Sequence, residues 1–192
     1  MSLLVVPLSP SGRHAMAQPL HPLNLQRWID EHRDALQPPV GNKVIWEDSE
    51  FIIMVIGGPN ARNDFHIDPG DEFFYQIQGE IVVEIIDRHG KRQPCRLREG
   101  DVMLCPALTP HSPQRAAGTV GLVVERKRRP EEKDGFAWFC EQCHAKIYEA
   151  WFNVSDIAGQ LKTLMETFYA DATLRTCHTC GTVLPVPTGP RL

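Results

Sequence analysis

The chain has 192 residues, of which 42% are hydrophobic and 23% charged, and its formal net charge at pH 7 is −4. This length allows one domain with a sizeable core and a small additional lobe. The negative net charge argues against a nucleic-acid partner. No apolar run reaches the roughly 20 residues that a membrane-spanning helix needs.

The N-terminal region contains a tail and one expected helix. Residues 1–18 include the short apolar run Leu3–Val6 but lack the basic segment and the length of a signal peptide. We therefore interpret residues 1–18 as a flexible tail and expect a cytoplasmic protein. Residues 24–36 are predicted to form a helix with Asn24 as its N-cap, because their apolar residues recur at helical spacing.

The middle of the chain has the pattern of an all-β domain. Short β-branched and aromatic segments are separated by Gly, Pro and Asp, at 44–46, 51–58, 72–77, 81–87, 101–105 and 120–125. Their regular spacing indicates a β-sandwich or β-barrel. We assign residues 19–134 to this barrel. The basic cluster Arg126–Arg129 that follows the last segment is interpreted as a solvated strand exit.

A first motif lies in the stretch HIDPGDEFFYQIQG, from His66 to Gly79. Its Pro69-Gly70 dipeptide predicts a turn between a strand that ends near His66 and a strand that begins with Glu72. Two such facing strands would present an imidazole and a carboxylate to one point.

A second motif, from Gly100 to Arg115, contains Pro106 and His111. Together the two stretches resemble the two motifs of cupin barrels, except that Asp68 stands where a second histidine is usual. His66, Glu72 and His111 remain as two imidazoles and one carboxylate, a set that suits Fe(II), Mn(II) or Ni(II) and leaves positions open for substrate and dioxygen. A lone buried histidine is more often a core residue, but three potential ligands at both motif spacings favour a metal site.

Three charged residues flank these ligands in sequence. Arg62 precedes His66 by four residues, Arg115 follows His111 by four, and Glu125 ends an apolar strand segment. Each alone has an alternative as a surface residue. Two arginines inside a barrel, however, need anionic partners, and an arginine–carboxylate pair suits the recognition of an acidic ligand.

The C-terminal part carries two Cys-x-x-Cys pairs, Cys140/Cys143 and Cys177/Cys180. This spacing predicts a four-thiolate metal site. Residues 155–169 between the pairs are predicted to be helical, with Ser155 as N-cap. We assign residues 135–192 to a four-cysteine lobe and tail, frayed from Val183 on. The remaining candidates are interpreted as ordinary strand residues (Cys95, Cys105) or as outer or surface groups (His144, His178).

Most of the chain resembles one family, 3-hydroxyanthranilate 3,4-dioxygenase in its bacterial two-metal form. The resembling stretches are NLQRWIDEH (24–32), PPVGNKVIWEDSEF (38–51), GGPNARNDFHIDPGDEFFYQIQG (57–79), LREGDVMLCPALTPHSPQR (97–115), VVER (123–126), DGFAWFCEQC (134–143) and CHTCG (177–181). The combination of the Asp68 cupin variant with paired Cys-x-x-Cys motifs makes the resemblance specific.

The resemblance implies a mainly β, jelly-roll-like cupin barrel with an N-terminal helix and a small, rubredoxin-like four-cysteine lobe. It implies Fe(II) on His66, Glu72 and His111, and a second iron on the cysteines, where zinc also fits. Glu72, Arg115 and Glu125 would contact the substrate, and Arg62 would lie beside dioxygen.

The activity implied by the resemblance is an extradiol-type ring opening of 3-hydroxyanthranilate, in tryptophan or 2-nitrobenzoate catabolism. The product, 2-amino-3-carboxymuconate 6-semialdehyde, cyclises to quinolinate. The expected partners are therefore a small aromatic acid and dioxygen. An exposed strand or the cysteine-rich lobe offers a surface through which a homodimer could form, but the sequence does not decide the oligomeric state. Two alternatives remain: another cupin oxygenase or isomerase acting on an acidic aromatic substrate, and a non-catalytic metal-binding cupin.

Overall fold

The computed structural model describes residues 21–38, 41–153 and 157–189. The tail assigned to residues 1–18 and the Ser155 cap lie outside these ranges. The chain divides into a short unit up to Glu31 and a main unit from His32 onward. Among the described helices, none is both long and apolar enough to span a membrane.

The first unit contains helix α1, Leu25–Glu31. The Asn24 side-chain oxygen accepts a hydrogen bond from the backbone N–H of Arg27 at 2.9 Å, which confirms the predicted N-cap. The helix is shorter than predicted, because His32 adopts φ −120° and ψ 17° and the chain continues as the 3-10 turn η1, Arg33–Leu36.

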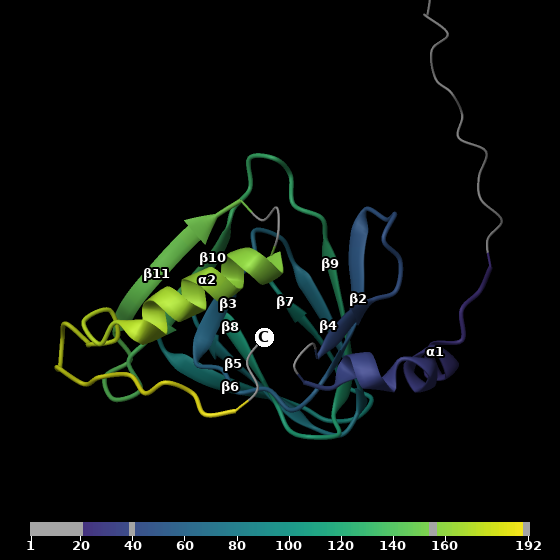
Figure 1. Cartoon of the computed structure of the whole chain (residues 1–192), viewed down its shortest axis with the longest axis horizontal. Helices are drawn as coiled ribbons and strands as arrows, with labels where there is room; N and C mark the ends of the chain where they lie inside the picture. The colour runs from purple at the N-terminus through teal and green to yellow at the C-terminus, as the bar shows by residue number, and fades with distance from the viewer. Residues whose placement is uncertain (1–20, 39–40, 154–156, 190–192) are drawn as a thin grey trace, which may run out of the picture. The chain divides into compact units, whose positions relative to one another are not determined.

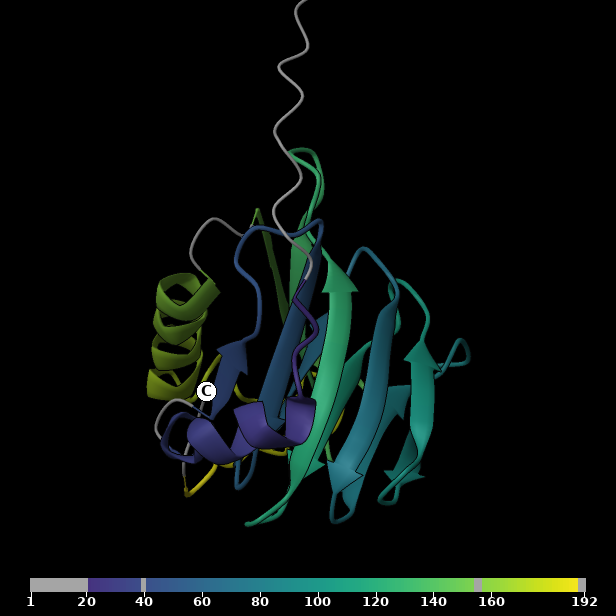
Figure 2. The same ribbon diagram turned by 90° about the vertical axis from the view of Figure 1, so that its right-hand side faces the viewer.

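The main unit is built from two antiparallel sheets that face each other (Figures 1 and 2). The five-stranded sheet has the order β1 (Asn42–Val44), β2 (Phe51–Gly57), β9 (Val120–Arg126), β4 (Glu72–Gln78) and β7 (Val102–Cys105). The six-stranded sheet has the order β11 (Lys146–Phe152), β10 (Asp134–Phe139), β3 (Asp64–Ile67), β8 (His111–Arg115), β5 (Ile81–Ile86) and β6 (Arg92–Leu97). The predicted mainly β class is confirmed, as a pair of antiparallel sheets.

Apolar side chains from both sheets fill part of the space between them. The buried members are Phe74, Ile81, Val83, Leu97, Cys105 and Val123. Each large apolar side chain of this kind contributes about 1.5–3 kcal/mol through burial. On β4 the buried residues alternate with more exposed ones, so that Glu72, Phe74 and Gln76 share the inner face. The interior therefore carries polar residues at positions where a plain barrel would carry apolar ones.

The six-stranded sheet extends beyond residue 134, where the sequence indicates the end of the barrel. β10 pairs with β3 and β11 pairs with β10, so residues 134–139 and 146–152 belong to the sheet. Helix α2 (Ile157–Ala170) lies across these two strands (Figure 1). The rings of Trp138 and Phe168 stack with centroids 4.0 Å apart. The cysteine lobe is thus joined to the sheet through a common apolar core.

Residues 183 and 184, after the second cysteine pair, are hydrogen-bonded to the cysteine lobe, and the prediction that the chain frays from Val183 is wrong for them. Val183 forms a β-bridge with Thr176, and Leu184 is only 1% exposed. The backbone N–H of Leu184 also donates to the carbonyl of Arg175 at 2.9 Å.

Candidate metal centre

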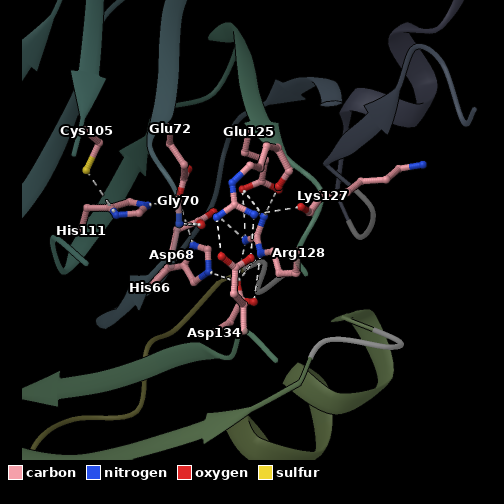
Figure 3. Close-up of polar contacts among 12 residues, drawn as sticks. His66, Asp68, Gly70, Glu72, Cys105, His111, Glu125, Lys127, Arg128 and Asp134 are labelled. Atoms are coloured by element: carbon pink, nitrogen blue, oxygen red, sulfur yellow. Dashed lines mark hydrogen bonds and ion pairs between the residues drawn. The ribbon is translucent and has the colours of Figure 1, made fainter. Parts of the chain in front are cut away.

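Strand register brings the three expected metal ligands to one end of the interior. His66 on β3 lies directly opposite His111 on β8. In the other sheet, Glu72 on β4 lies opposite Glu125 on β9 and Cys105 on β7. Each sheet therefore contributes polar side chains to the site. Figure 3 shows those of His66, His111, Glu72 and Glu125 close together.

The ligand atoms of these three residues converge. Glu72 Oε1 lies 3.3 Å from His66 Nδ1 and 3.1 Å from His111 Nε2. This oxygen is buried and has no hydrogen-bond partner of good geometry. A buried acceptor without a donor is costly, and a cation between the three groups would satisfy it. The donor set fits a divalent metal ion.

The electrostatics of the site favour positive charge. Burial alone would lower the pKa of His66, but its hydrogen bond with Asp134 and the nearby carboxylate of Glu72 outweigh it and raise the pKa to about 9. Burial acts in the same way on His111, and the charge of Glu72 raises its pKa to about 9. Although burial opposes ionisation of Glu72, the two histidines hold its pKa well below the ordinary value.

The second nitrogen of each imidazole has its own partner. His66 Nε2 lies 2.7 Å from Asp134 Oδ1, and His111 Nδ1 lies 3.0 Å from the carbonyl oxygen of Thr109. Protons on these two nitrogens leave the other nitrogens free to bind a metal, which is how outer partners orient ligands. Cys105, predicted to be an ordinary strand residue, is part of this arrangement, because its Sγ lies 3.5 Å from His111 Nδ1.

The prediction that the basic cluster 126–129 is a solvated strand exit is wrong for Arg128. The Arg128 side chain is only 9% exposed and forms ion pairs with Asp68, Glu125 and Asp134 (Figure 3). Burial disfavours its charge, but these carboxylates outweigh burial and raise the pKa of Arg128. Asp68 therefore contacts a guanidinium, and its other oxygen accepts the Gly70 N–H at 2.6 Å.

The buried charges in and around the site leave a negative excess. All the buried acidic residues that the structure describes belong to this set: Asp64, Asp68, Glu72, Glu125 and Asp134. They face three guanidiniums, those of Arg62, Arg115 and Arg128. When all five carboxylates are ionised and both imidazoles are neutral, as metal binding requires, the excess of two negative charges matches one divalent cation. Burial, Glu72 and Asp68 raise the pKa of Glu125 to about 8, while Arg128 opposes this shift.

Arg115 and Arg62 lie in different local environments. Arg115 shares the inner face of β8 with His111 and is 4% exposed, and its Nη1 has no hydrogen-bond partner. Burial lowers the pKa of Arg115 to about 10, and the charge of Arg62 acts in the same direction. Arg62 is paired: its Nε and Nη2 lie 3.2 and 2.5 Å from the two Asp64 oxygens.

Two asparagines secure the loop that carries Arg62. Asn60 accepts the backbone N–H of Arg115 at 2.8 Å and donates to the carbonyl of Pro113 at 2.9 Å. Asn63 accepts the Tyr169 hydroxyl at 2.6 Å and donates to the carbonyl of Pro185 at 2.9 Å. The loop is thus hydrogen-bonded to β8 on one side and to the cysteine lobe on the other.

The four expected cysteine ligands form a second cluster. Cys140 Sγ lies 3.6 Å from Cys180 Sγ, and Cys143 Sγ lies 3.5 Å from Cys177 Sγ. Metal–sulfur bonds of about 2.3 Å in a tetrahedron place the sulfurs about 3.8 Å apart, so this cluster fits a tetrahedral metal. The residue after each pair, His144 or Gly181, has a positive φ of 62° or 76°. His144 and His178 are exposed, as expected.

Several site residues were not predicted from the sequence. These are Asn60, Asp64, Cys105, Arg128 and Asp134. The clearest available signal was Asp134, a carboxylate at the start of the apolar run Phe136–Phe139. An acidic residue that begins a strand buried along its whole length needs a cationic or donor partner.

Comparison with known proteins gives consistent results. A family model for 3-hydroxyanthranilic acid dioxygenase matches residues 17–169. The chain is 49% identical over 174 residues to a Bacillus thuringiensis (strain Al Hakam) protein named 3-hydroxyanthranilate 3,4-dioxygenase, covering 91% of this chain and 97% of that protein. A Xanthomonas euvesicatoria protein of the same name is 51% identical over 166 residues, covering 86% and 93%. Among solved structures, a cupin-2 domain containing protein from Shewanella frigidimarina aligns with a TM-score of 0.43 and 15% identity, covering 52% of this chain and 92% of that chain.

Proposed function

Because this chain belongs to the 3-hydroxyanthranilic acid dioxygenase family, we propose that it opens the ring of 3-hydroxyanthranilate with dioxygen at the His66–Glu72–His111 site. The ring would break beside the hydroxyl-bearing carbon, and both oxygen atoms would enter 2-amino-3-carboxymuconate 6-semialdehyde. This product closes to quinolinate with loss of water. The observation that supports the proposal is that His111, one of three converging potential ligands, shares the inner face of β8 with Arg115, whose buried Nη1 has no hydrogen-bond partner.

Fe(II) is the metal that we assign to the three ligands. Two imidazole nitrogens and one carboxylate oxygen are the donor set typical of non-haem Fe(II) oxygenases. When bound, Fe(II) supplies the electron-transfer chemistry that lets dioxygen react with an aromatic ring. Asp134 and the carbonyl of Thr109 would hold the His66 and His111 rings in the tautomers that binding requires.

Arg115 is assigned to the substrate carboxylate. Its guanidinium is buried and Nη1 lacks a partner, so an anionic group would satisfy an otherwise costly donor. A charge-assisted contact of this kind contributes about 1.5–3 kcal/mol. A neutral substrate would leave this donor unsatisfied, which favours an acidic aromatic compound.

Glu125 is assigned to the amino and hydroxyl edge of the substrate, next to Glu72. Burial and the charge of Glu72 raise the pKa of Glu125 in the metal-free site, and a carboxylate at this position could accept the hydroxyl proton of the substrate. A cation held by Glu72 would offset the negative charge that opposes ionisation of Glu125. Deprotonation of the hydroxyl would then make the ring a better electron donor.

Arg62 is assigned to the dioxygen side of the site. Its positive charge would stabilise negative charge that develops on the oxygen atoms during the reaction. The ion pair with the buried Asp64 supports this role, because it holds the guanidinium in one orientation.

The four-cysteine cluster is proposed to hold iron or zinc in a structural role. A closed shell of four thiolates leaves no position for substrate. Cys-x-x-Cys pairs that form no disulfide and bind a metal instead are typical of a reducing compartment, and we accordingly propose a cytoplasmic enzyme.

A homodimer is the assembly that we propose. The outward positions of β4 and β7 carry large apolar side chains: Phe73 is 37%, Val102 61% and Leu104 59% exposed. Phe73 and Leu104 are opposite each other in the register, so the exposed side chains lie side by side. Contiguous apolar surface of this kind marks protein interfaces.

The function is tested by oxygen uptake after anaerobic loading with Fe(II). With 3-hydroxyanthranilate, the iron-loaded protein should consume one dioxygen per substrate while the ring absorbance disappears. His111→Ala should lose both signals, whereas the exposed control His89→Ala should retain them. A fully iron-loaded protein that consumes no oxygen with this substrate would refute the proposal. Uptake with a different acidic aromatic compound would then support another oxygenase.

A further inference from the structure

We propose that Arg128 is a positioning residue of the metal centre, holding His66 through Asp134 and holding Glu125 by direct contact. The part that concerns Glu125 rests on the proposed function. The part that concerns His66 is about metal binding and holds for any reaction at the site.

The guanidinium of Arg128 and the carboxylate of Asp134 form two parallel hydrogen bonds. Arg128 Nε lies 2.9 Å from Asp134 Oδ2, and Nη2 lies 2.5 Å from Oδ1. Because a paired contact of this geometry fixes the planes of guanidinium and carboxylate, it sets the rotation of the Asp134 side chain. Asp134 is 0% exposed, so protein contacts determine its orientation.

The orientation of Asp134 determines the orientation of His66. The same Oδ1 that contacts Arg128 lies 2.7 Å from His66 Nε2. A proton on Nε2 leaves Nδ1 unprotonated and directed toward Glu72 Oε1, 3.3 Å away. Arg128 is thus two contacts from a metal ligand and determines which nitrogen of that ligand faces the metal.

The second set of contacts reaches the substrate side of the site. Arg128 Nη1 lies 3.2 Å and Nη2 3.3 Å from Glu125 Oε2, and Nη2 lies 2.6 Å from Asp68 Oδ2. Buried carboxylates this close repel one another unless a cation lies between them. Arg128 therefore keeps Glu125 beside the metal ligands instead of allowing it to turn away.

Both roles require an arginine. Lysine carries the same charge but presents one ammonium in place of a planar fork with five donors. Arg128→Lys should keep the charge that the buried carboxylates need and lose the geometry that orients Asp134. This substitution separates positioning from simple charge neutralisation.

The test measures Fe(II) affinity without substrate. One equivalent of zinc per chain is first added to fill the four-cysteine site, because thiolates take zinc in preference to the nitrogen and oxygen ligands, and bound Fe(II) is then measured by anaerobic equilibrium dialysis. Loss of an outer-shell partner typically reduces metal affinity about 10- to 100-fold, and we expect this loss in Arg128→Lys. Arg126→Lys is the matched control, because Arg126 forms an equally paired contact with Glu132 at 2.6 Å outside the site. Its Fe(II) affinity should match that of the unaltered protein.

A double-mutant cycle tests the route through Asp134. Asp134→Asn alone should lower Fe(II) affinity by a similar factor. In that background, Arg128→Lys should cost little more, because the carboxylate through which it acts is already gone. Unchanged affinity in Arg128→Lys, or fully additive losses, would overturn the proposal. Should Arg128→Lys fail to fold, unchanged Fe(II) affinity in Asp134→Asn would overturn it equally.

The contact with Glu125 has a separate readout. At saturating Fe(II), Arg128→Lys should still show a reduced kcat, and this remaining loss should disappear in a Glu125→Gln background. An unchanged kcat at saturating Fe(II) would remove Glu125 from the proposal. If the unaltered iron-loaded protein does not act on 3-hydroxyanthranilate, the proposed function fails, while the affinity measurements still decide the role of Arg128 toward His66.

Discussion

Arg115 combines deep burial with an unsatisfied donor, and this makes its substitution informative. Arg115→Ala should raise KM for 3-hydroxyanthranilate about 10- to 150-fold, the equivalent of one charge-assisted contact, with a smaller effect on kcat. The same variant should treat 2-aminophenol, which lacks the carboxylate, much as the unaltered enzyme does. Steady-state kinetics with both substrates measures the difference. Equal losses with both compounds would contradict the assignment of the carboxylate to Arg115.

Gly121 provides the space that the Arg115 guanidinium occupies. A Cβ at this position would lie 2.9 Å from Arg115 Nη1 and 3.2 Å from Gln76 Oε1. Because these are the ends of flexible side chains, Gly121→Ala should displace them without unfolding the protein. We expect a higher KM for 3-hydroxyanthranilate, an unchanged KM for 2-aminophenol and a nearly unchanged melting temperature. A large drop in melting temperature without a change in KM would show that Gly121 serves packing instead.

The ionisable residues of the site were only partly predictable from the sequence. The spacing of the two motifs predicted His66, Glu72 and His111, because each motif places potential metal ligands at the start or end of a strand. Arg128 was missed because it lies in a run of four basic residues, and composition cannot separate the one that turns inward from its neighbours. Lys127 and Arg129, on either side of it, are exposed. The partners that hold Arg128 inside come from three separate segments, so tertiary structure decides its burial.

At the scale of elements, the cysteine lobe is expected to stabilise the fold. Cys140 and Cys177 lie in the same apolar cluster as Trp138, Phe168 and Leu184. Loss of the metal would release both knuckles from this cluster. Cys140→Ser should therefore lower the melting temperature by about 10 °C or more, and should lower turnover per folded, iron-loaded enzyme much less.

Thermal unfolding and low-temperature kinetics test this expectation together. The matched control is Cys95→Ser, in which the substituted thiol lies on β6 outside the knuckles, and its melting temperature should change little. A Cys140→Ser protein with a normal melting temperature and lost turnover would indicate a redox role for the thiolate site.

The strands divide into those that the sequence predicted and those that it did not. β1, β2, β4, β5, β7 and β9 were predicted within one or two residues, because they carry β-branched, aromatic or other apolar residues between turn residues. β6 and β8 were missed, because each is polar and contains a proline. Proline is tolerated in both strands. Pro94 lies on an edge strand. β8 pairs with β3 only at His111, so the backbone of Pro113, two residues later, has no partner on β3 to lose. β8 is polar because its inner face carries site residues.

At the scale of the whole molecule, both sheets contribute residues to the proposed metal site, and one chain supplies all three. His66 and His111 come from the six-stranded sheet and Glu72 from the five-stranded sheet. The site therefore forms only when the sheets pack against each other, and a metal that binds the folded state should stabilise it. Since every residue assigned to the reaction lies within the chain, catalysis should not depend on assembly.

The proposed homodimer can be separated from catalysis by a charge on the apolar face of β7. Leu104 is 59% exposed and lies opposite Phe73. In a two-fold interface a substitution is present twice, so Leu104→Lys would bury two charges and should shift the protein to a monomer. Val183→Lys, at a residue 48% exposed on the cysteine lobe, is the matched control and should leave the dimer intact. Sedimentation equilibrium measures the mass, and the monomeric variant should retain its kcat. An unaltered protein that sediments as a monomer, or a Leu104→Lys protein that remains a dimer, would place the interface elsewhere or remove it.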